Sequence, residues 1–116
     1  MIVPFGQDAF QIQLAAAASE LEACNKATRR HGIVLSEPDI RALVVGRRES
    51  LALSERVEFG GGTTKELVLA FASSPYVSQA TFVDTVLALQ DLFYEVKNES
   101  LEQIPDDELI AKMRSL

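Results

Sequence analysis

Glu58 is the residue of this chain best placed to act as a general acid or base. It lies in the segment Arg56–Phe59, which alternates polar and apolar side chains. A carboxyl group that apolar neighbours partly bury has a raised pKa, which suits proton transfer near neutral pH. No second catalytic partner follows from the sequence, so we assign no catalytic residue. We expect Glu58 to form a structural ion pair with an arginine, for example Arg47 or Arg48.

A second candidate site is the glycine-rich loop Gly60–Lys65, which comes directly before a predicted helix. Free backbone N–H groups at a helix N-terminus can hold a phosphate or a carboxylate. The loop lacks the glycine and lysine spacing of a P-loop. It is either a turn that needs glycine for a positive φ or an anion site. The candidate ligand-binding residues are Arg47, Arg48, Glu58, Gly61, Gly62, Thr63 and Lys65.

Three carboxylates, Asp91, Glu95 and Glu99, recur every four residues and share one face of a predicted helix. Carboxylate oxygens can bind a hard cation such as Mg²⁺ or Ca²⁺. A di-iron bundle would need Glu-x-x-His pairs, and the single histidine, His31, is far away in the sequence. We interpret the carboxylates as a solvated acidic stripe and predict no metal site and no cofactor.

The single cysteine, Cys24, excludes an internal disulfide and a cysteine-rich zinc site. Cys24 falls on an apolar helical stripe, where a free thiol packs as a small hydrophobic group. No Cys–His or Ser–His–Asp pattern supports a hydrolase. A reducing, cytoplasmic location fits this composition.

The elements that position these candidate residues are predicted to be helices. The chain of 116 residues is 47% hydrophobic, which is enough for one domain over residues 1–116. Apolar residues recur at alternating steps of three and four, so we predict an all-α fold, a compact bundle or array of about five helices. The predicted helices cover residues 8–31, 36–54, 63–72, 78–98 and 106–116. The predicted buried face of the fourth helix consists of Phe82, Val86, Leu89, Phe93 and Val96.

Local signals place the ends of these helices. Ser36, Thr63 and Ser78 are predicted N-caps, and Glu66 completes a capping box with Thr63. Gly32, which follows three basic residues, is predicted to end the first helix. Gly46 lies inside the second helix and predicts either a kink there or a close contact between helices. Residues 56–59 are predicted to be a short extended segment without a partner strand.

The charge distribution argues against nucleic acid as a partner. The net charge is −6, and residues 57–116 hold all of the excess, with ten acidic and four basic side chains. A polyphosphate would be repelled by such a chain. No apolar run approaches the ~20 residues that a membrane helix needs, and the first residues do not resemble a signal peptide.

Three stretches of the chain together resemble a known family. They are RVEFGGG at 56–62, SPYV at 74–77 with LQDLFYEVKNES at 89–100, and DDELI at 106–110. The order is similar to a family of small uncharacterised bacterial proteins, a domain of unknown function. The resemblance covers roughly residues 36–116 and implies a single-domain cytoplasmic bacterial protein, with no reaction or ligand attached to it.

No pattern in the sequence fixes a biochemical activity, so the function is reached by elimination. We expect an accessory protein that binds another protein or itself rather than an enzyme, and we expect Tyr94 to be half exposed beside Tyr76. The alternative is an anion-binding protein or small enzyme that uses the Gly60–Lys65 loop and Glu58. The candidate protein-contact residues are Tyr76, Val83, Leu87 and Tyr94.

Overall fold

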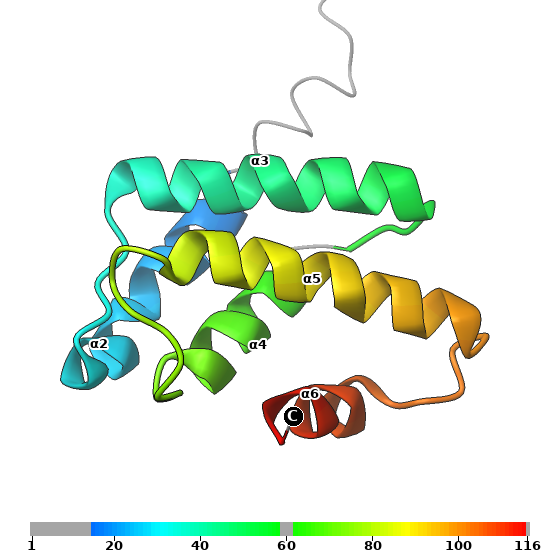
Figure 1. Ribbon diagram of the computed structural model, residues 1–116. Helices are drawn as coiled ribbons and strands as arrows, with labels where there is room; N and C mark the ends of the chain where they lie inside the picture. Colours follow the sequence, from blue (N-terminus) through cyan, green and yellow to red (C-terminus); the bar gives the residue numbers. More distant parts are fainter. Residues whose placement is uncertain (1–14, 59–61, 116) are drawn as a thin grey trace, which may run out of the picture.

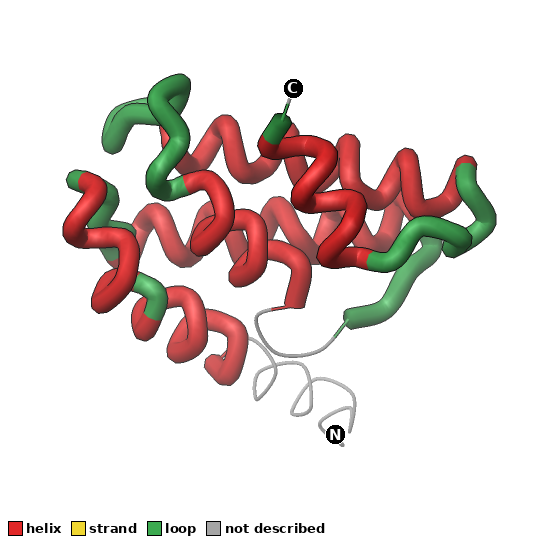
Figure 2. The backbone as a smooth tube through the Cα atoms, turned by 90° about the horizontal axis from the view of Figure 1, so that it is seen from below, coloured by secondary structure: helices red, strands yellow, loops and turns green. Residues whose placement is uncertain are grey.

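The protein is all-α, as predicted, and the computed structural model describes residues 15–58 and 62–115 (Figure 1). The described residues contain no strand, so the expected extended segment is an irregular connection at 56–58 (Figure 2). Residues 15–23 are helical and lead into two short helices, α2 and η1. The labelled helices are α2 (Asn25–Thr28), η1 (Arg29–His31), α3 (Glu37–Ser54), α4 (Gly62–Phe71), α5 (Phe82–Glu99) and α6 (Asp106–Arg114).

The two longest helices, α3 and α5, lie side by side and run in the same direction (Figure 1). Gly46 lies where the two helices meet, because a Cβ atom there would collide with the Leu87 side chain. Ser50 on α3 donates a hydrogen bond to Asp91 on α5 at 2.6 Å. Helix α3 continues through Gly46 without a break, so the predicted alternative of a close helix contact is the one observed.

Helices α4 and α6 lie below α5 in the view of Figure 1, and α6 packs against α4. Buried side chains from the first helical segment, from the connection at 33–36 and from α3, α4, α5 and α6 make one hydrophobic core. Residues 8–14 of the first predicted helix lie outside the described residues. The fully buried side chains of this core include Leu21, Leu43, Leu67, Val68, Phe82, Val86, Phe93 and Tyr94.

Two of the predicted helix-end signals are confirmed. The Ser36 side chain accepts from the Asp39 backbone N–H at 3.3 Å, and the Asp39 carboxylate accepts from the Ser36 N–H at 2.9 Å. This reciprocal pair is a capping box at the start of α3. Gly32 ends the first helical region in the left-handed conformation, with φ of 80°.

Two other predicted caps are wrong. Thr63 lies inside the first turn of α4, and its hydroxyl donates to Glu58. Helix α5 begins at Phe82 rather than near Ser78, and Thr81 at its N-cap makes no side-chain cap bond. The Ser78 and Thr81 hydroxyls are hydrogen-bonded to each other at 2.9 Å, so Ser78 belongs to the preceding turn.

Amide side chains fix the extended connection at 33–36 between the first helices and α3. Asn25 bonds both the backbone N–H and the C=O of Leu35, at 2.7 and 3.0 Å. Gln79 does the same for Val34, at 2.7 and 2.9 Å. Each side-chain amide makes the two hydrogen bonds that a neighbouring strand would make. The backbone N–H and C=O groups of Val34 and Leu35 are therefore hydrogen-bonded although no sheet is present here.

Candidate functional site

The carboxylate of Glu58 is the centre of a polar cluster that joins α3, α4 and α5. It accepts hydrogen bonds from the Thr63 N–H at 3.1 Å, the Thr63 hydroxyl at 2.5 Å and the Tyr94 hydroxyl at 2.7 Å. Its Oε1 also lies 3.4 Å from Nε of Arg47, whose side chain is buried. The predicted pairing of Glu58 with an arginine is therefore confirmed, and the partner is Arg47.

The backbone around α4 explains why Glu58 occupies this position. Helix α4 starts at Gly62, and the Glu58 carboxylate accepts from one of the N–H groups of its first turn. A carboxylate is a favourable partner for those N–H groups, which have no acceptor inside the helix. Glu58 thus serves as the cap that the sequence assigned to Thr63.

Gly62 is required by this arrangement on two grounds. Its φ is +48°, in the left-handed region. An added Cβ would also lie 2.5 Å from Oε1 of Glu58 and 2.8 Å from Nη2 of Arg47. Any larger residue would therefore push the ion pair apart.

Tyr94 belongs to this cluster, and its predicted environment was wrong. Its side chain is 1% exposed, so the expectation of a half-exposed tyrosine beside Tyr76 is wrong. Burial raises the pKa of the Tyr94 hydroxyl, and the hydrogen bond to Glu58 raises it further. Tyr94 is therefore held as a neutral donor to the Glu58 carboxylate.

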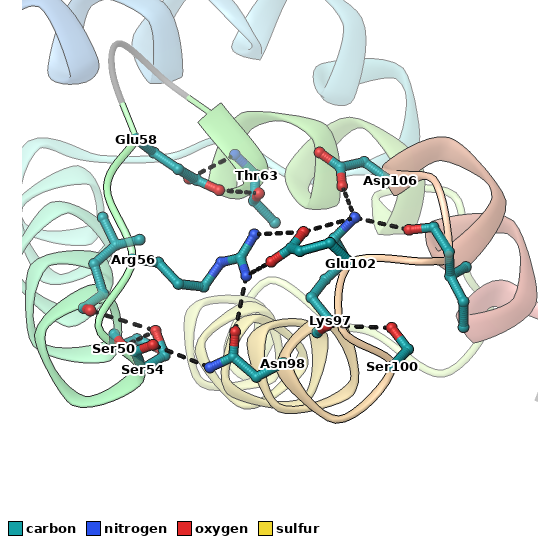
Figure 3. Close-up of polar contacts among 12 residues, drawn as sticks. Ser50, Ser54, Arg56, Glu58, Thr63, Lys97, Asn98, Ser100, Glu102 and Asp106 are labelled. Carbon is teal, nitrogen blue, oxygen red and sulfur yellow. Dashed lines mark hydrogen bonds and ion pairs between the residues drawn. The ribbon is translucent and has the colours of Figure 1, made fainter.

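A second polar cluster lies where α3 and α5 end, with Glu102 at its centre (Figure 3). Arg56 donates to Glu102 and, at 2.9 Å, to Asn98, and its guanidinium lies 5.6 Å from the centre of the Tyr94 ring. The hydrogen bond to Glu102 is the largest cause that raises the pKa of Arg56. The same bond is the main reason why the pKa of Glu102 is lowered.

Lys97 connects the second cluster to α6. Its buried ammonium group lies 2.7 Å from the Asp106 carboxylate and 3.3 Å from that of Glu102, and it donates to the Ile104 carbonyl at 2.7 Å. The hydrogen bond to Asp106 is the largest cause that raises the pKa of Lys97. One lysine thus holds both the 100–105 connection and the first residue of α6.

The structure brings together only some of the predicted ligand-binding residues. Arg47, Glu58, Gly62 and Thr63 are in one cluster, whereas Gly61 lies outside the described residues. Arg48 is exposed on α3, and Lys65 is half-buried on α4. Binding of an anion by this set stays a prediction.

No pattern in the sequence indicated that Arg56, Lys97, Asn98 and Glu102 form a cluster. The nearest signal was the spacing within α5, where Phe82, Val86 and Phe93 are buried as predicted. The same face also buries Gln90 and Lys97, in place of the expected Leu89 and Val96, which are only partly buried. A polar residue on that face is a candidate for a paired, buried group.

The predicted protein-contact residues have three different environments. Tyr76 is 88% exposed in the connection between α4 and α5. Val83 and Leu87 are partly buried against the core, so they do not form an exposed apolar face with Tyr94. Contact of Tyr76, Val83 or Leu87 with a partner stays a prediction.

The acidic stripe of Asp91, Glu95 and Glu99 is solvent-exposed on α5. Among the described residues, no group of three or more His, Cys, Asp or Glu side chains is placed to hold a metal ion. The three carboxylates point from successive turns and do not converge. Within the same part of the chain, no helix is both long and apolar enough to cross a bilayer.

Fold and site together define an all-α protein whose partly buried carboxylate, Glu58, is engaged in contacts within the chain. The chain belongs to a family of unknown function (DUF6323), whose model matches residues 20–116. No curated protein and no solved structure matches the chain.

Proposed function

We propose that this protein is a non-catalytic accessory protein that binds a partner protein where α3 and α5 end. The observation that carries the proposal is the exposure of three apolar side chains at or just after the ends of these two helices, Leu53, Val57 and Leu101. They are 88%, 78% and 80% exposed, respectively. We call these three residues the apolar end surface.

The segments that carry these side chains are tied to one another. Asn98 donates to the Ser54 carbonyl at 3.0 Å, and Arg56 bonds both Asn98 and Glu102. Both helices end at the same side of the molecule (Figure 1). Exposed apolar side chains on connected segments form a surface that a partner can cover.

The backbone conformation at Leu101 adds support. Leu101 and Glu102 have φ values of 55° and 64°, in the left-handed region. That conformation costs about 1–2 kcal/mol per residue for an L-amino acid, and glycine usually occupies it. Here the ion pairs of Glu102 with Arg56 and Lys97 stabilise the turn. One of the two residues with positive φ is therefore Leu101, whose side chain is exposed to solvent, rather than a glycine without a side chain.

The alternative function, anion binding by the Gly60–Lys65 loop, has less support. The Thr63 N–H and hydroxyl at the start of α4 already donate to the Glu58 carboxylate. An external anion would have to compete with a carboxylate that the same chain supplies. The contacts of Glu58 are those of a structural cap and ion pair.

Affinity capture with the full-length tagged chain tests the proposed function. We would compare the wild type with L53S/V57S/L101S and, as a control, with Y76S, which removes an equally exposed side chain elsewhere. Eluates would be analysed for proteins and for small molecules by mass spectrometry, and size-exclusion chromatography would report self-association. Exposed substitutions usually change stability by less than about 0.5 kcal/mol, and melting curves would verify this.

The expected result is a stoichiometric protein partner that the triple variant loses and Y76S retains. A partner retained equally by both variants, or lost only with Y76S, would contradict the apolar end surface. A retained metabolite without any protein would favour the anion-binding alternative.

We also propose a bacterial, cytoplasmic setting for this protein. The support is the sequence resemblance together with a single cysteine, Cys24, which is buried and free. A chain without disulfides suits a reducing compartment.

A further inference from the structure

The apolar end surface continues into a hollow between the C-terminal halves of α3 and α5. The hollow has a volume of about 350 Å³, and its walls include Leu53 and Ser50 from α3 and Asp91, Glu95 and Glu99 from α5. The hydrogen bond from Ser50 to Asp91 crosses between the two helices, so the hollow lies along their contact line.

The hollow is acidic on its α5 side. Asp91, Glu95 and Glu99 are all exposed, and none of the described residues that line the hollow is a lysine or an arginine. Two cations at this end of the molecule, Arg56 and Lys97, already pair with Glu102. A ligand that neutralises these carboxylates therefore has to be positively charged itself.

The hollow also offers apolar contact, because the exposed Leu53 side chain is part of its wall. Val57 and Leu101 extend the apolar area beyond the helix ends. A small inorganic cation would use none of this apolar surface, and the carboxylates do not converge on one point. A partner segment with both apolar and basic side chains matches both properties.

The spacing of the carboxylates indicates the conformation of the partner segment. Asp91, Glu95 and Glu99 are four residues apart on α5, so they rise along it by roughly 6 Å per step. Lysine or arginine side chains four residues apart on a second helix have the same spacing. A helix with an apolar stripe beside that basic stripe can lie in a groove and bury its apolar anchors.

We infer that the binding partner of this protein is a basic amphipathic helix, which lies along the α3–α5 hollow with its apolar face on Leu53. This inference rests on the proposed function and deepens it by naming the chemistry of the partner. Its cations pair with Asp91, Glu95 and Glu99, and its apolar side chains cover the end surface.

A synthetic helix tests this inference with the full-length protein. The probe is an 18-residue fluorescent peptide with leucines on one face and arginines four residues apart beside them, and its twin carries glutamates in place of the arginines. Fluorescence anisotropy would give the Kd of each peptide at low and at physiological salt. NMR shifts of the labelled protein would locate the bound peptide.

The matched variants are E95K/E99K in the hollow and E22K/D107K outside it, which change the net charge equally at exposed positions. We expect E95K/E99K to weaken binding of the basic peptide at least about tenfold, and E22K/D107K to weaken it less than about threefold. The glutamate twin should not bind, and the shifts should fall on α3 and α5.

Three results would overturn the inference: no binding of the basic peptide to the wild type, equal loss in both double variants, or shifts that fall elsewhere. Failure of the proposed function is a separate result, since it is measured by capture with L53S/V57S/L101S. A captured partner that needs Leu53 but whose binding segment carries no basic helix would leave the function standing and refute this inference.

Discussion

The two glutamate-centred clusters use the same chemistry in different surroundings. Glu58 and Glu102 each bind an arginine, and each closes a connection that follows one of the two long helices. The Glu58 side chain is 17% exposed and that of Glu102 is 52% exposed. Solvent therefore screens the second cluster much more than the first.

This difference in exposure indicates different roles: the Glu58 cluster stabilises the fold, and the Glu102 cluster positions a surface residue. The Glu58 cluster joins three helices through a buried arginine, a buried tyrosine and a helix N-terminus, so loss of one member removes a contact from a buried polar group. The Glu102 cluster positions Leu101 beside the solvent, where water can replace a lost contact. We expect mutations to show this contrast as a large effect at Glu58 and a small one at Glu102.

The largest effect is expected for Glu58→Ala. It leaves the buried Arg47 guanidinium without its carboxylate, and breaking a buried ion pair costs about 3–5 kcal/mol. The free energy of unfolding from urea denaturation would measure it, with Glu102→Ala as the control. A loss below about 1 kcal/mol at Glu58 would contradict the contrast, and Glu58→Gln provides a milder variant where the alanine variant does not fold.

The next effect is expected for Gly62→Ala, which combines a left-handed φ with a Cβ that collides with Glu58 and Arg47. We expect a loss of about 2–4 kcal/mol. The matched control is Gly32→Ala, where φ is +80° but nothing lies within 4 Å of the added Cβ. It should lose only about 1 kcal/mol, so equal losses in the two melting experiments would disprove the close approach at Gly62.

A smaller effect is expected for Tyr94→Phe, which removes one hydrogen-bond donor to a charged acceptor. The expected loss is about 1.5–3 kcal/mol. Because the folded-state pKa of Tyr94 is raised, its stabilising effect is present below the unfolded value near pH 10 and is lost at higher pH. Ultraviolet titration of a Tyr76→Phe variant would follow Tyr94 alone, and ionisation at or below pH 10 would contradict its burial.

The smallest effect is expected for Glu102→Gln, at up to ~1 kcal/mol in low salt and less in high salt. The folded-state pKa of Glu102 is lowered, so its contribution is present above the unfolded pKa and disappears as the pH falls through the folded value. The stability difference from the wild type should therefore shrink below about pH 4. A difference that is constant with pH and salt would show that the pair does not act electrostatically.

The helical architecture was predictable from the sequence because apolar spacing reports directly on helix faces. Ser36 and Gly32 also marked helix ends correctly, since their hydrogen-bond partners are a few residues away along the chain. Asp106 marked the start of α6 through the run of acidic residues in its first turn. Thr63 was misassigned because a more distant carboxylate, Glu58, supplied the cap. Local patterns cannot rank such competing acceptors.

Of the candidate site, only the ion pair between Arg47 and Glu58 was predictable from the sequence. Arg47 and Glu58 were expected to pair, and the structure confirms their ion pair. Tyr94 was placed half exposed because Leu89 and Val96 were expected on the buried face of α5, where Gln90, Tyr94 and Lys97 lie instead. Lys97 and Glu102 were missed, because their contacts depend on a turn after α5 in which two residues adopt positive φ.

The shared direction of α3 and α5 also shapes the electric field of the molecule. Each helix dipole places about half a negative charge at its C-terminal end, and in a parallel pair these charges add instead of cancelling. Helix α3 has no basic residue in its last turn, and the one in α5, Lys97, is buried and paired. A positively charged partner would therefore be drawn toward this end before contact, so its association rate should fall steeply with ionic strength while its dissociation rate follows the apolar contacts.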